Sequence, residues 1–352
     1  MVGAIHIGDR AVGPGAPCFV IAEAGVNHNG DLDLAHALID VAAGAGADAV
    51  KFQTYSTPHL VTERAPKAQY QMIDVADEES QYDMLARLEL SELDHVELRD
   101  HCKDLRLEFL SSPFDARCAD MLDRLGLRAF KLASGELTNL PLLRHVAGLG
   151  KPLILSTGMA DLDEVRTAVE ALRGAGDPPL ALLHCVSAYP APLEDCNLRA
   201  MATLAREFGL PVGWSDHTEG TAVAVAAVAL GAVIVEKHFT LDRDLPGPDH
   251  QASLEPDDLI QLVRAVRAVE PALGDGIKRP RACEANTAEV ARKSLVAARN
   301  LTGGAPLIDG DLIVRRPGTG LPPARLDEVT GRRLRTDVAV GTPLTEDMLE
   351  PK

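Results

Sequence analysis

The segment CFVIAEAGVNHNGDLDLAHALIDVAAGAG, residues 18–46, contains one complete unit of the predicted fold. It begins with an apolar run that ends in a carboxylate, Glu23, which predicts a buried strand. Leu34 and Leu38 then lie one helical turn apart, and Gly46 follows where a helix would end. Connections between a strand and a helix are usually short and bland, but this one carries two asparagines, a histidine and two glycines. The composition of this connection indicates a binding function.

The same unit recurs as far as residue 274. Eight apolar runs of β type alternate with alanine- and leucine-rich stretches of helical period, and no Rossmann glycine fingerprint is present. The pattern therefore predicts a (β/α)8 TIM barrel rather than a doubly wound sheet. The eight runs are residues 18–23, 48–53, 107–112, 128–134, 152–157, 180–185, 210–215 and 232–237. The longest interruption, residues 55–85, predicts an active-site lid.

The composition changes near Gly274, where the repeating pattern stops. We predict a catalytic barrel over residues 1–274, a polar and basic linker over 275–290, and a small mixed domain over 291–352. A domain of about 60 residues builds only a marginal core. We therefore expect it to pack on the barrel or on a second subunit.

Overall charge and composition argue against several classes of partner. The net charge of −17 disfavours nucleic acid and anionic lipid, and the aromatic content of 3% leaves few side chains on which bases can stack. We find no apolar run near the roughly 20 residues of a membrane span and no signal-peptide core. Six scattered cysteines without a C-x-x-C pair are typical of reduced thiols. The sequence thus predicts a cytoplasmic protein with no nucleic-acid or membrane partner.

Polar side chains follow every predicted strand. In a (β/α)8 barrel the carboxyl ends of the strands meet at one face and carry the active site, so these side chains would line one cavity. In chain order they are Glu23, Asn27, His28, Lys51, Gln53, Ser111, Ser112, Lys131, Ser134, Glu136, Ser156, Thr157, His184, Ser187, Tyr189, Ser215, Asp216, His217, Glu236, Lys237 and His238.

Two histidines, His217 and His238, lie at equivalent places after the seventh and eighth runs. Neighbouring parallel strands are about 4.8 Å apart, so both rings would reach one divalent cation and leave positions open for water or substrate. The alternative is a pair of histidines that are hydrogen-bonded to nearby carboxylates. A structural zinc site is disfavoured, because four nitrogen or sulfur ligands are not apparent.

Two lysines, Lys51 and Lys131, follow apolar runs and should point into the barrel. Buried ammonium groups require anionic partners, so together with the strand-end serines they predict a phosphate or carboxylate ligand. Alternatively, they pair with Glu23 or Glu236, or Lys51 forms a Schiff base as in barrel aldolases.

Glu23 and Tyr189 each allow two interpretations. Burial of Glu23 would raise its pKa toward that of a general base, whereas an ion pair with Lys51 would make it structural. Tyr189 begins a proline-rich loop that would hold its ring rigidly, and simple packing is the alternative.

Ordered motifs along the whole chain resemble the sialic acid synthase family. They include IAEAGVNHNGD, ADAVKFQTY, KLASGE, STGMA, YPAP, WSDHTEG, VEKHFTLDR and PGPDHQASL, and the tail ARKSLVAARNL…GDLIVRRPGTG resembles its C-terminal SAF (antifreeze-like) domain. The resemblance implies condensation of phosphoenolpyruvate with an N-acetylated hexosamine to give a nine-carbon 2-keto acid and phosphate. It also implies a divalent cofactor, Mn²⁺ or Mg²⁺, and a homodimer in which each SAF domain covers the partner's barrel.

Site roles follow from the resemblance, motif by motif. It implies that His217 and His238 bind the metal and that Glu23 is the base or orients a water. The residues implied for phosphoenolpyruvate are Lys51, Lys131, Ser134, Ser156 and Ser215, those for the sugar are Gln53, Tyr189 and Asp249, and Ser112 and Ser187 complete the substrate-binding set. Arg316 would reach in from the partner and hold the acceptor's N-acetyl group.

The acceptor sugar is less determined than the reaction. We rank N-acetylmannosamine first because Asp249 can accept hydrogen bonds from sugar hydroxyls, and a dideoxy diacetamido hexose of the legionaminic branch second, ahead of the pseudaminic one. Two other classes stay open, a lysine-dependent aldolase and a non-catalytic carbohydrate-binding protein.

Overall fold

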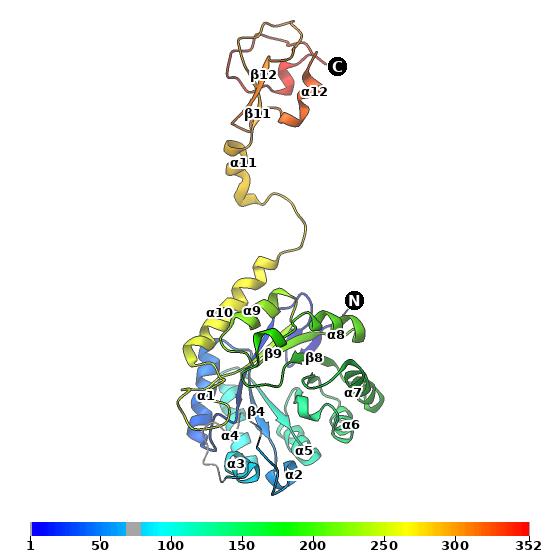
Figure 1. Cartoon of the computed structure of the whole chain (residues 1–352), viewed down its shortest axis with the longest axis vertical. Coiled ribbons are helices and arrows are strands. Elements are labelled where there is room, and N and C mark those ends of the chain that lie inside the picture. Colours follow the sequence, from blue (N-terminus) through cyan, green and yellow to red (C-terminus); the bar gives the residue numbers. More distant parts are fainter. Residues whose placement is uncertain (1, 68–78, 352) are drawn as a thin grey trace. The chain divides into compact units, whose positions relative to one another are not determined.

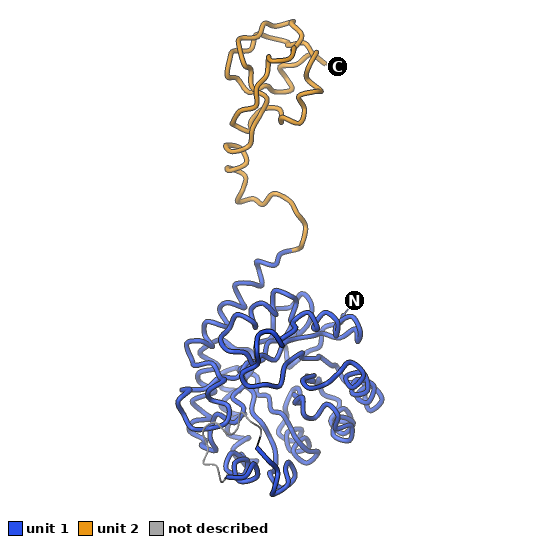
Figure 2. Tube along the Cα trace, viewed as in Figure 1, with its two compact units in different colours: residues 1–274 blue, residues 275–352 orange. Residues whose placement is uncertain are grey.

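A computed structural model describes residues 2–67 and 79–351 of the chain. They form two compact units, residues 1–274 and 275–352, which are coloured separately in Figure 2. The predicted lid, residues 55–85, includes residues 68–78, which lie outside the described part. No helix among the described residues is both long and apolar enough to cross a membrane.

Eight parallel strands form the central sheet of the first unit (Figure 1). Their order is β5-β4-β3-β10-β9-β8-β7-β6, and β5 and β6 are in contact across the remaining seam, so the sheet is a nearly closed barrel. The predicted (β/α)8 barrel is therefore confirmed. The strands are β3 (Phe19–Gly25), β4 (Ala49–Thr54), β5 (Glu108–Pro113), β6 (Phe130–Leu132), β7 (Leu153–Ser156), β8 (Leu180–Cys185), β9 (Val212–Asp216) and β10 (Ile234–His238).

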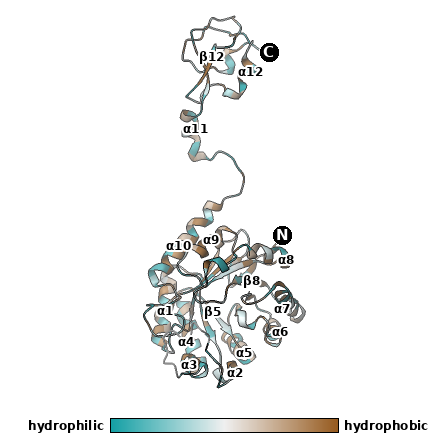
Figure 3. Cartoon of the chain, viewed as in Figure 1, coloured by the Kyte–Doolittle hydropathy of each residue, from teal (hydrophilic) through white to brown (hydrophobic). Residues whose placement is uncertain are grey.

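Helices surround this sheet, and hydrophobic and hydrophilic residues alternate along them (Figure 3). In the first of them, Asp31 accepts hydrogen bonds from the Asp33 and Leu34 amides, and Gly46 ends the helix with a φ of 79°. The helices are α1 (Leu32–Ala45), α2 (Thr57–Leu60), α3 (Gln81–Leu88), α4 (Glu92–Asp104), α5 (Ala116–Leu125), α6 (Leu140–Gly148), α7 (Leu162–Ala175), α8 (Ala200–Phe208), α9 (Ala222–Ala229) and α10 (Pro256–Leu273).

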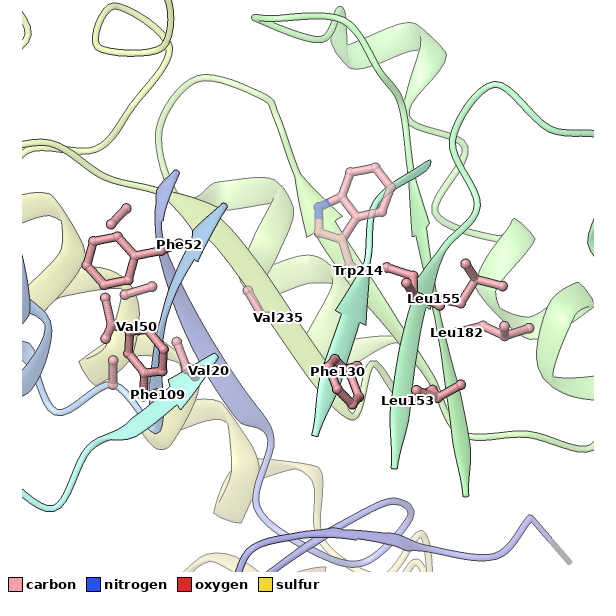
Figure 4. Packing of buried hydrophobic residues seen from close by; sticks show 14 of the residues in the cluster. Val20, Val50, Phe52, Phe109, Phe130, Leu153, Leu155, Leu182, Trp214 and Val235 are labelled. Atoms are coloured by element: carbon pink, nitrogen blue, oxygen red, sulfur yellow. The ribbon is translucent and has the colours of Figure 1, made fainter. Parts of the chain in front are cut away.

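Alternating residues of the strands form two apolar layers. Those that face the helices, such as Val20, Phe109 and Trp214, form the main core (Figure 4). Those that face the barrel axis, such as Ile21 and Leu110, form a second cluster inside the barrel. An unpredicted antiparallel hairpin of β1 (Ile5–Ile7) and β2 (Arg10–Val12) packs against this second cluster through Ile5, Ile7 and Val12.

The second unit has an apolar core of its own, formed by leucines, valines and alanines between Leu295 and Leu349. Its two antiparallel strands are β11 (Ser294–Ala297) and β12 (Leu312–Arg315), and it also contains α12 (Leu326–Val329). The segment that we predicted as a linker, residues 275–290, is partly helical, because α11 (Ala285–Ala291) begins within it.

Candidate active site

Four charged side chains meet inside the barrel, and we call Glu23, Lys51, Lys131 and Glu236 the charge ring. Lys51 Nζ lies 2.7 Å from Glu23 Oε2 and 3.9 Å from Glu236 Oε2, and Lys131 Nζ lies 3.4 Å from Glu236 Oε1. Lys131 on β6 and Glu236 on β10 belong to strands that are not neighbours, so they meet across the barrel axis. All four side chains are at most 5% exposed.

Burial and pairing set the protonation of the charge ring. Burial raises the pKa of Glu23 to about 7, although Lys51 opposes the change. Burial alone would also raise the pKa of Glu236, but the two lysines together hold it below its usual value. Burial lowers the pKa of Lys131, whereas the pKa of Lys51 is raised, because Glu23 and Glu236 outweigh its burial. Near neutral pH, Glu23 is thus the carboxylate of the ring that can gain or lose a proton.

The two histidines stand beside this ring, with centroids 5.6 Å apart, and the Tyr189 ring lies 4.2 Å from that of His217. His217 Nδ1 donates to the Val186 carbonyl at 2.6 Å, which leaves Nε2 as an unprotonated nitrogen. His238 Nδ1 is buried and has no hydrogen-bond partner among the described residues. Burial lowers the pKa of both rings, so both are neutral at pH 7.

Neutral imidazoles with available nitrogens fit a divalent cation. The described residues contain no group of three or more His, Cys, Asp or Glu side chains that could hold a metal ion.

Hydroxyl groups surround the lysines. Lys51 donates to Ser112 Oγ at 3.2 Å, and Ser215 donates to Glu236 Oε1 at 3.0 Å. Ser156 Oγ is buried and lacks a hydrogen-bond partner in the described part of the chain. Ser156 lies on β7, next to the strand that carries Lys131, and its unsatisfied hydroxyl could bind an anionic ligand.

A second group of small polar side chains gathers around Gly158. Its amide donates to Ser134 Oγ at 3.0 Å, and Ser134 Oγ lies 3.2 Å from Cys185 Sγ. A Cβ at Gly158 would stand 2.8 Å from Ser134 Oγ and closer still to Ser187 Oγ, so only glycine leaves this space open.

Asp249, which is predicted to contact the sugar, has a carboxylate oxygen 3.8 Å from His238 Nδ1. Glu23 and Asp249 both approach Gly25, whose added Cβ would stand 3.4 Å from an oxygen of each. Gln53 lies two residues after Lys51 on β4, so its side chain faces the barrel axis as that of Lys51 does. Arg316 belongs to the second unit, where its Nε donates to the Ala291 carbonyl at 3.0 Å.

Several other strand-end residues face the helices instead. His184 Nε2 donates to the Cys196 carbonyl at 3.0 Å, and its ring packs on Trp214, with ring centroids 5.2 Å apart. Asp216 and Lys237 pair with each other at 3.1 Å outside the barrel interior. Ser111 Oγ lies 2.6 Å from Thr54 Oγ1, which in turn contacts His95 of α4. Our prediction that these four residues line the cavity is wrong, because alternate residues of a strand face opposite sides. The same rule identifies Cys185, which we missed, as the inward neighbour of His184.

Two family models match this chain. Residues 38–278 match the NeuB family model and residues 292–350 match the SAF domain. The chain is 46% identical to an N,N'-diacetyllegionaminic acid synthase of Legionella pneumophila over 97% of this chain and 98% of that protein. It is 48% identical to a synthase of the same name from Campylobacter jejuni over 89% of this chain and 94% of that protein.

A solved structure also covers most of the chain. It is the N-acetylneuraminic acid synthetase of Leptospira borgpetersenii, with a TM-score of 0.74 at 36% identity, covering 82% of this chain and 95% of that one. The family match extends over more than half of the chain, and the relatives align almost from end to end. The chain therefore belongs to the NeuB family and carries a C-terminal SAF domain.

Proposed function

We propose that this enzyme joins phosphoenolpyruvate to a diacetamido-dideoxy hexose and releases phosphate, as an N,N'-diacetyllegionaminic acid synthase. The charge ring beside two neutral histidines is the observation that carries the reaction class. The acceptor rests on the names of the two relatives at 46% and 48% identity. This reverses our ranking from the sequence, in which N-acetylmannosamine came first.

Lys51 and Lys131 hold the donor in this proposal. Phosphoenolpyruvate carries a phosphate and a carboxylate, and two ammonium groups with several hydroxyls offer charge-assisted hydrogen bonds to both. Ser156, whose hydroxyl lacks a partner within the described residues, would gain one from the donor, and Ser134 and Ser187 extend the same surface. Because these side chains are packed before the donor arrives, little ordering remains to be done when it binds.

His217 and His238 would hold a divalent cation, Mn²⁺ or Mg²⁺, which acts as a Lewis acid when bound. Both rings are neutral and so need lose no proton to bind it. Asp249, at 3.8 Å from His238, would orient the acceptor from the same side.

C3 of phosphoenolpyruvate attacks the aldehyde carbon of the open-chain sugar, the aldehyde oxygen takes a proton from Glu23 and becomes a hydroxyl, and C2 is left electron-poor. Water adds to C2, and Glu23 accepts the proton that this water loses. The C2–O bond to phosphate then breaks, the proton of the C2 hydroxyl leaves with the phosphate, and C2 becomes the ketone of the 2-keto acid. A pKa near 7 lets Glu23 accept a proton at neutral pH and return it in the next turnover.

The sugar end of the site includes Gln53 and Tyr189 in our proposal. We also propose that the chain works as a homodimer, in which Arg316 of one protomer completes the site of the other. Support for this comes from the residues alone: Arg316 is a cation on the small unit, and the N-acetyl carbonyl of an acceptor is a hydrogen-bond acceptor.

A Schiff-base mechanism has weaker support. An amine nucleophile must be neutral, but the carboxylates around Lys51 raise its pKa and keep it charged. The site also lacks any need for a lysine nucleophile, because phosphoenolpyruvate supplies its own activated carbon.

The test is phosphate release from phosphoenolpyruvate by the full chain with Mn²⁺ and three acceptors: the legionaminic-type diacetamido hexose, its pseudaminic-type isomer and N-acetylmannosamine. We expect release with the first, and loss of it in His217→Ala. Faster release with N-acetylmannosamine would overturn the acceptor assignment only. No release with any acceptor, together with borohydride trapping of pyruvate, would overturn the reaction class in favour of a lysine-dependent aldolase.

A further inference from the structure

A cavity of about 610 Å³ lies at the opposite end of the barrel from the candidate active site, and we call it the basic pocket. Glu108 at the start of β5 and Arg128 just before β6 line it, whereas the active site lies where these strands end. The remaining lining comes from the hairpin turn around Asp9, the last turns of α4 and the end of α5.

The pocket is far more cationic than the chain as a whole. Five of its fourteen lining residues are Lys or Arg and three are Asp or Glu, which leaves two net positive charges, whereas the whole chain carries −17. The five cations are Arg10, Arg99, Lys103, Arg106 and Arg128. Since the protein is strongly acidic overall, this local excess marks a place where an anion is favoured.

Some of these cations already have partners within the protein. Arg99 lies 2.7 Å from Asp100 and donates to the Leu125 carbonyl at 2.9 Å, and Arg10 pairs with Asp48. Within the described part of the chain, Arg128 has only long ion pairs, 3.7 Å to Asp9 and 3.9 Å to Glu108.

Two of the five cations have no partner among the described residues. Lys103 and Arg106 make no side-chain hydrogen bond or ion pair with any residue of 2–67 or 79–351. The charge available to a ligand is therefore supplied by these two, with Arg128 as a loosely paired third.

The floor of the pocket is apolar. Leu107, Phe109 and Leu127 are each at most 6% exposed and belong to the core behind the pocket. An inorganic ion would occupy only a small part of a cavity of about 610 Å³, whereas an organic molecule would fill more of it. The volume lies within the roughly 300–1,000 Å³ of small-molecule sites.

We propose that the basic pocket binds a nucleotide-sized organic phosphate, with its phosphate on Lys103, Arg106 and Arg128 and its organic part in the remaining volume of the cavity. Guanidinium groups match phosphate oxygens through paired hydrogen bonds, which favours phosphate at an arginine-rich rim. This site is separate from the charge ring and does not depend on the reaction proposed above.

The test uses the full chain and isothermal titration at low salt with three probes: uridine 5′-monophosphate, uridine and inorganic phosphate. We expect the nucleotide to bind more tightly than either fragment. The double variant K103Q/R106Q should weaken its binding by about tenfold, because two charge-assisted contacts are lost. Both side chains are exposed, so the variant should keep the wild-type melting temperature.

The matched control is R144Q/R264Q, which removes the same charge from exposed arginines that do not line the pocket and form no ion pair among the described residues. This variant should bind the nucleotide as the wild type does. Equal weakening in both variants would show a general effect of charge, and an unchanged affinity in K103Q/R106Q would place the nucleotide elsewhere, for instance on the active-site lysines. Either result, or the absence of binding at millimolar nucleotide, would overturn the proposal.

Discussion

The Glu23→Gln variant should change how the stability of the barrel depends on pH. Burial raises the pKa of Glu23 from its ordinary 4.5 to about 7. The unfolded chain releases this proton near pH 4.5, but the folded protein keeps it to about pH 7. Between these values the folded state binds more protons, so the free energy of unfolding falls as pH rises. This difference between the two pKa values corresponds to about 3 kcal/mol of unfolding free energy. The folded protein loses most of that stabilisation between pH 5 and pH 8.

Trp214 provides the assay. It is the single tryptophan of the chain and is fully buried on β9, so its fluorescence reports unfolding of the barrel unit. Urea titrations of the wild type and Glu23→Gln at pH 5 and pH 8 give the four free energies. We expect the variant to gain roughly 2–3 kcal/mol relative to the wild type between the two pH values, because glutamine has no proton to release.

Glu236→Gln is the matched control. Pairing with Lys131 and Lys51 lowers the pKa of Glu236, so its carboxylate contributes stability that is lost only as pH falls below 5. Its variant should be destabilised by about the same amount at pH 5 and pH 8, since breaking a buried ion pair leaves lysines uncompensated. If the difference between Glu23→Gln and the wild type also stays constant from pH 5 to pH 8, Glu23 is ionised throughout and our account of the proton acceptor is wrong.

Three further outcomes are expected. Ser156→Ala should raise the KM for phosphoenolpyruvate by about tenfold in steady-state assays with little change in urea stability, because its hydroxyl has no partner among the described residues. His217→Ala should lower phosphate release at least about 100-fold, and Mn²⁺ should restore activity to the EDTA-treated wild type but not to this variant. Gly213→Ala should destabilise the barrel by about 1–3 kcal/mol in the same urea titration, since its Cβ would stand 2.7 Å from Ile234 Cβ inside the barrel.

The barrel could be predicted from the sequence because its signal is local and repeated. Each apolar run is bounded by turn residues and followed by a stretch of helical period. Few folds other than the (β/α)8 barrel accommodate eight such units. The hairpin of β1 and β2 gives no such signal: each strand has three residues, and its apolar side chains Ile5, Ile7 and Val12 are ordinary in any loop.

The site was predictable only in part: the sequence identified the four charges and the possibility that they pair, but not which residues after each strand face inward. Alternation alone decides that Cys185 faces inward and His184 outward, and we overlooked it because both follow the same run. Which carboxylate meets which lysine depends on the register and closure of the sheet. Lys131 and Glu236 are 3.4 Å apart only because the barrel brings non-neighbouring strands across its axis.

The charge ring and the apolar layer beneath it come from the same strands. Glu23 stands two residues beyond Ile21, and Lys51 stands two residues beyond Ala49, so alternation places each charge above an apolar side chain that faces the same axis. Slipping β3 by one residue would turn Glu23 toward the helices and Ala22 toward Lys51. The packing that fixes the register therefore also fixes the distances among the four charges. A lysine or glutamate at this depth is tolerated only when it is paired. The folding of the barrel therefore also holds the four side chains of the charge ring in place before any ligand binds.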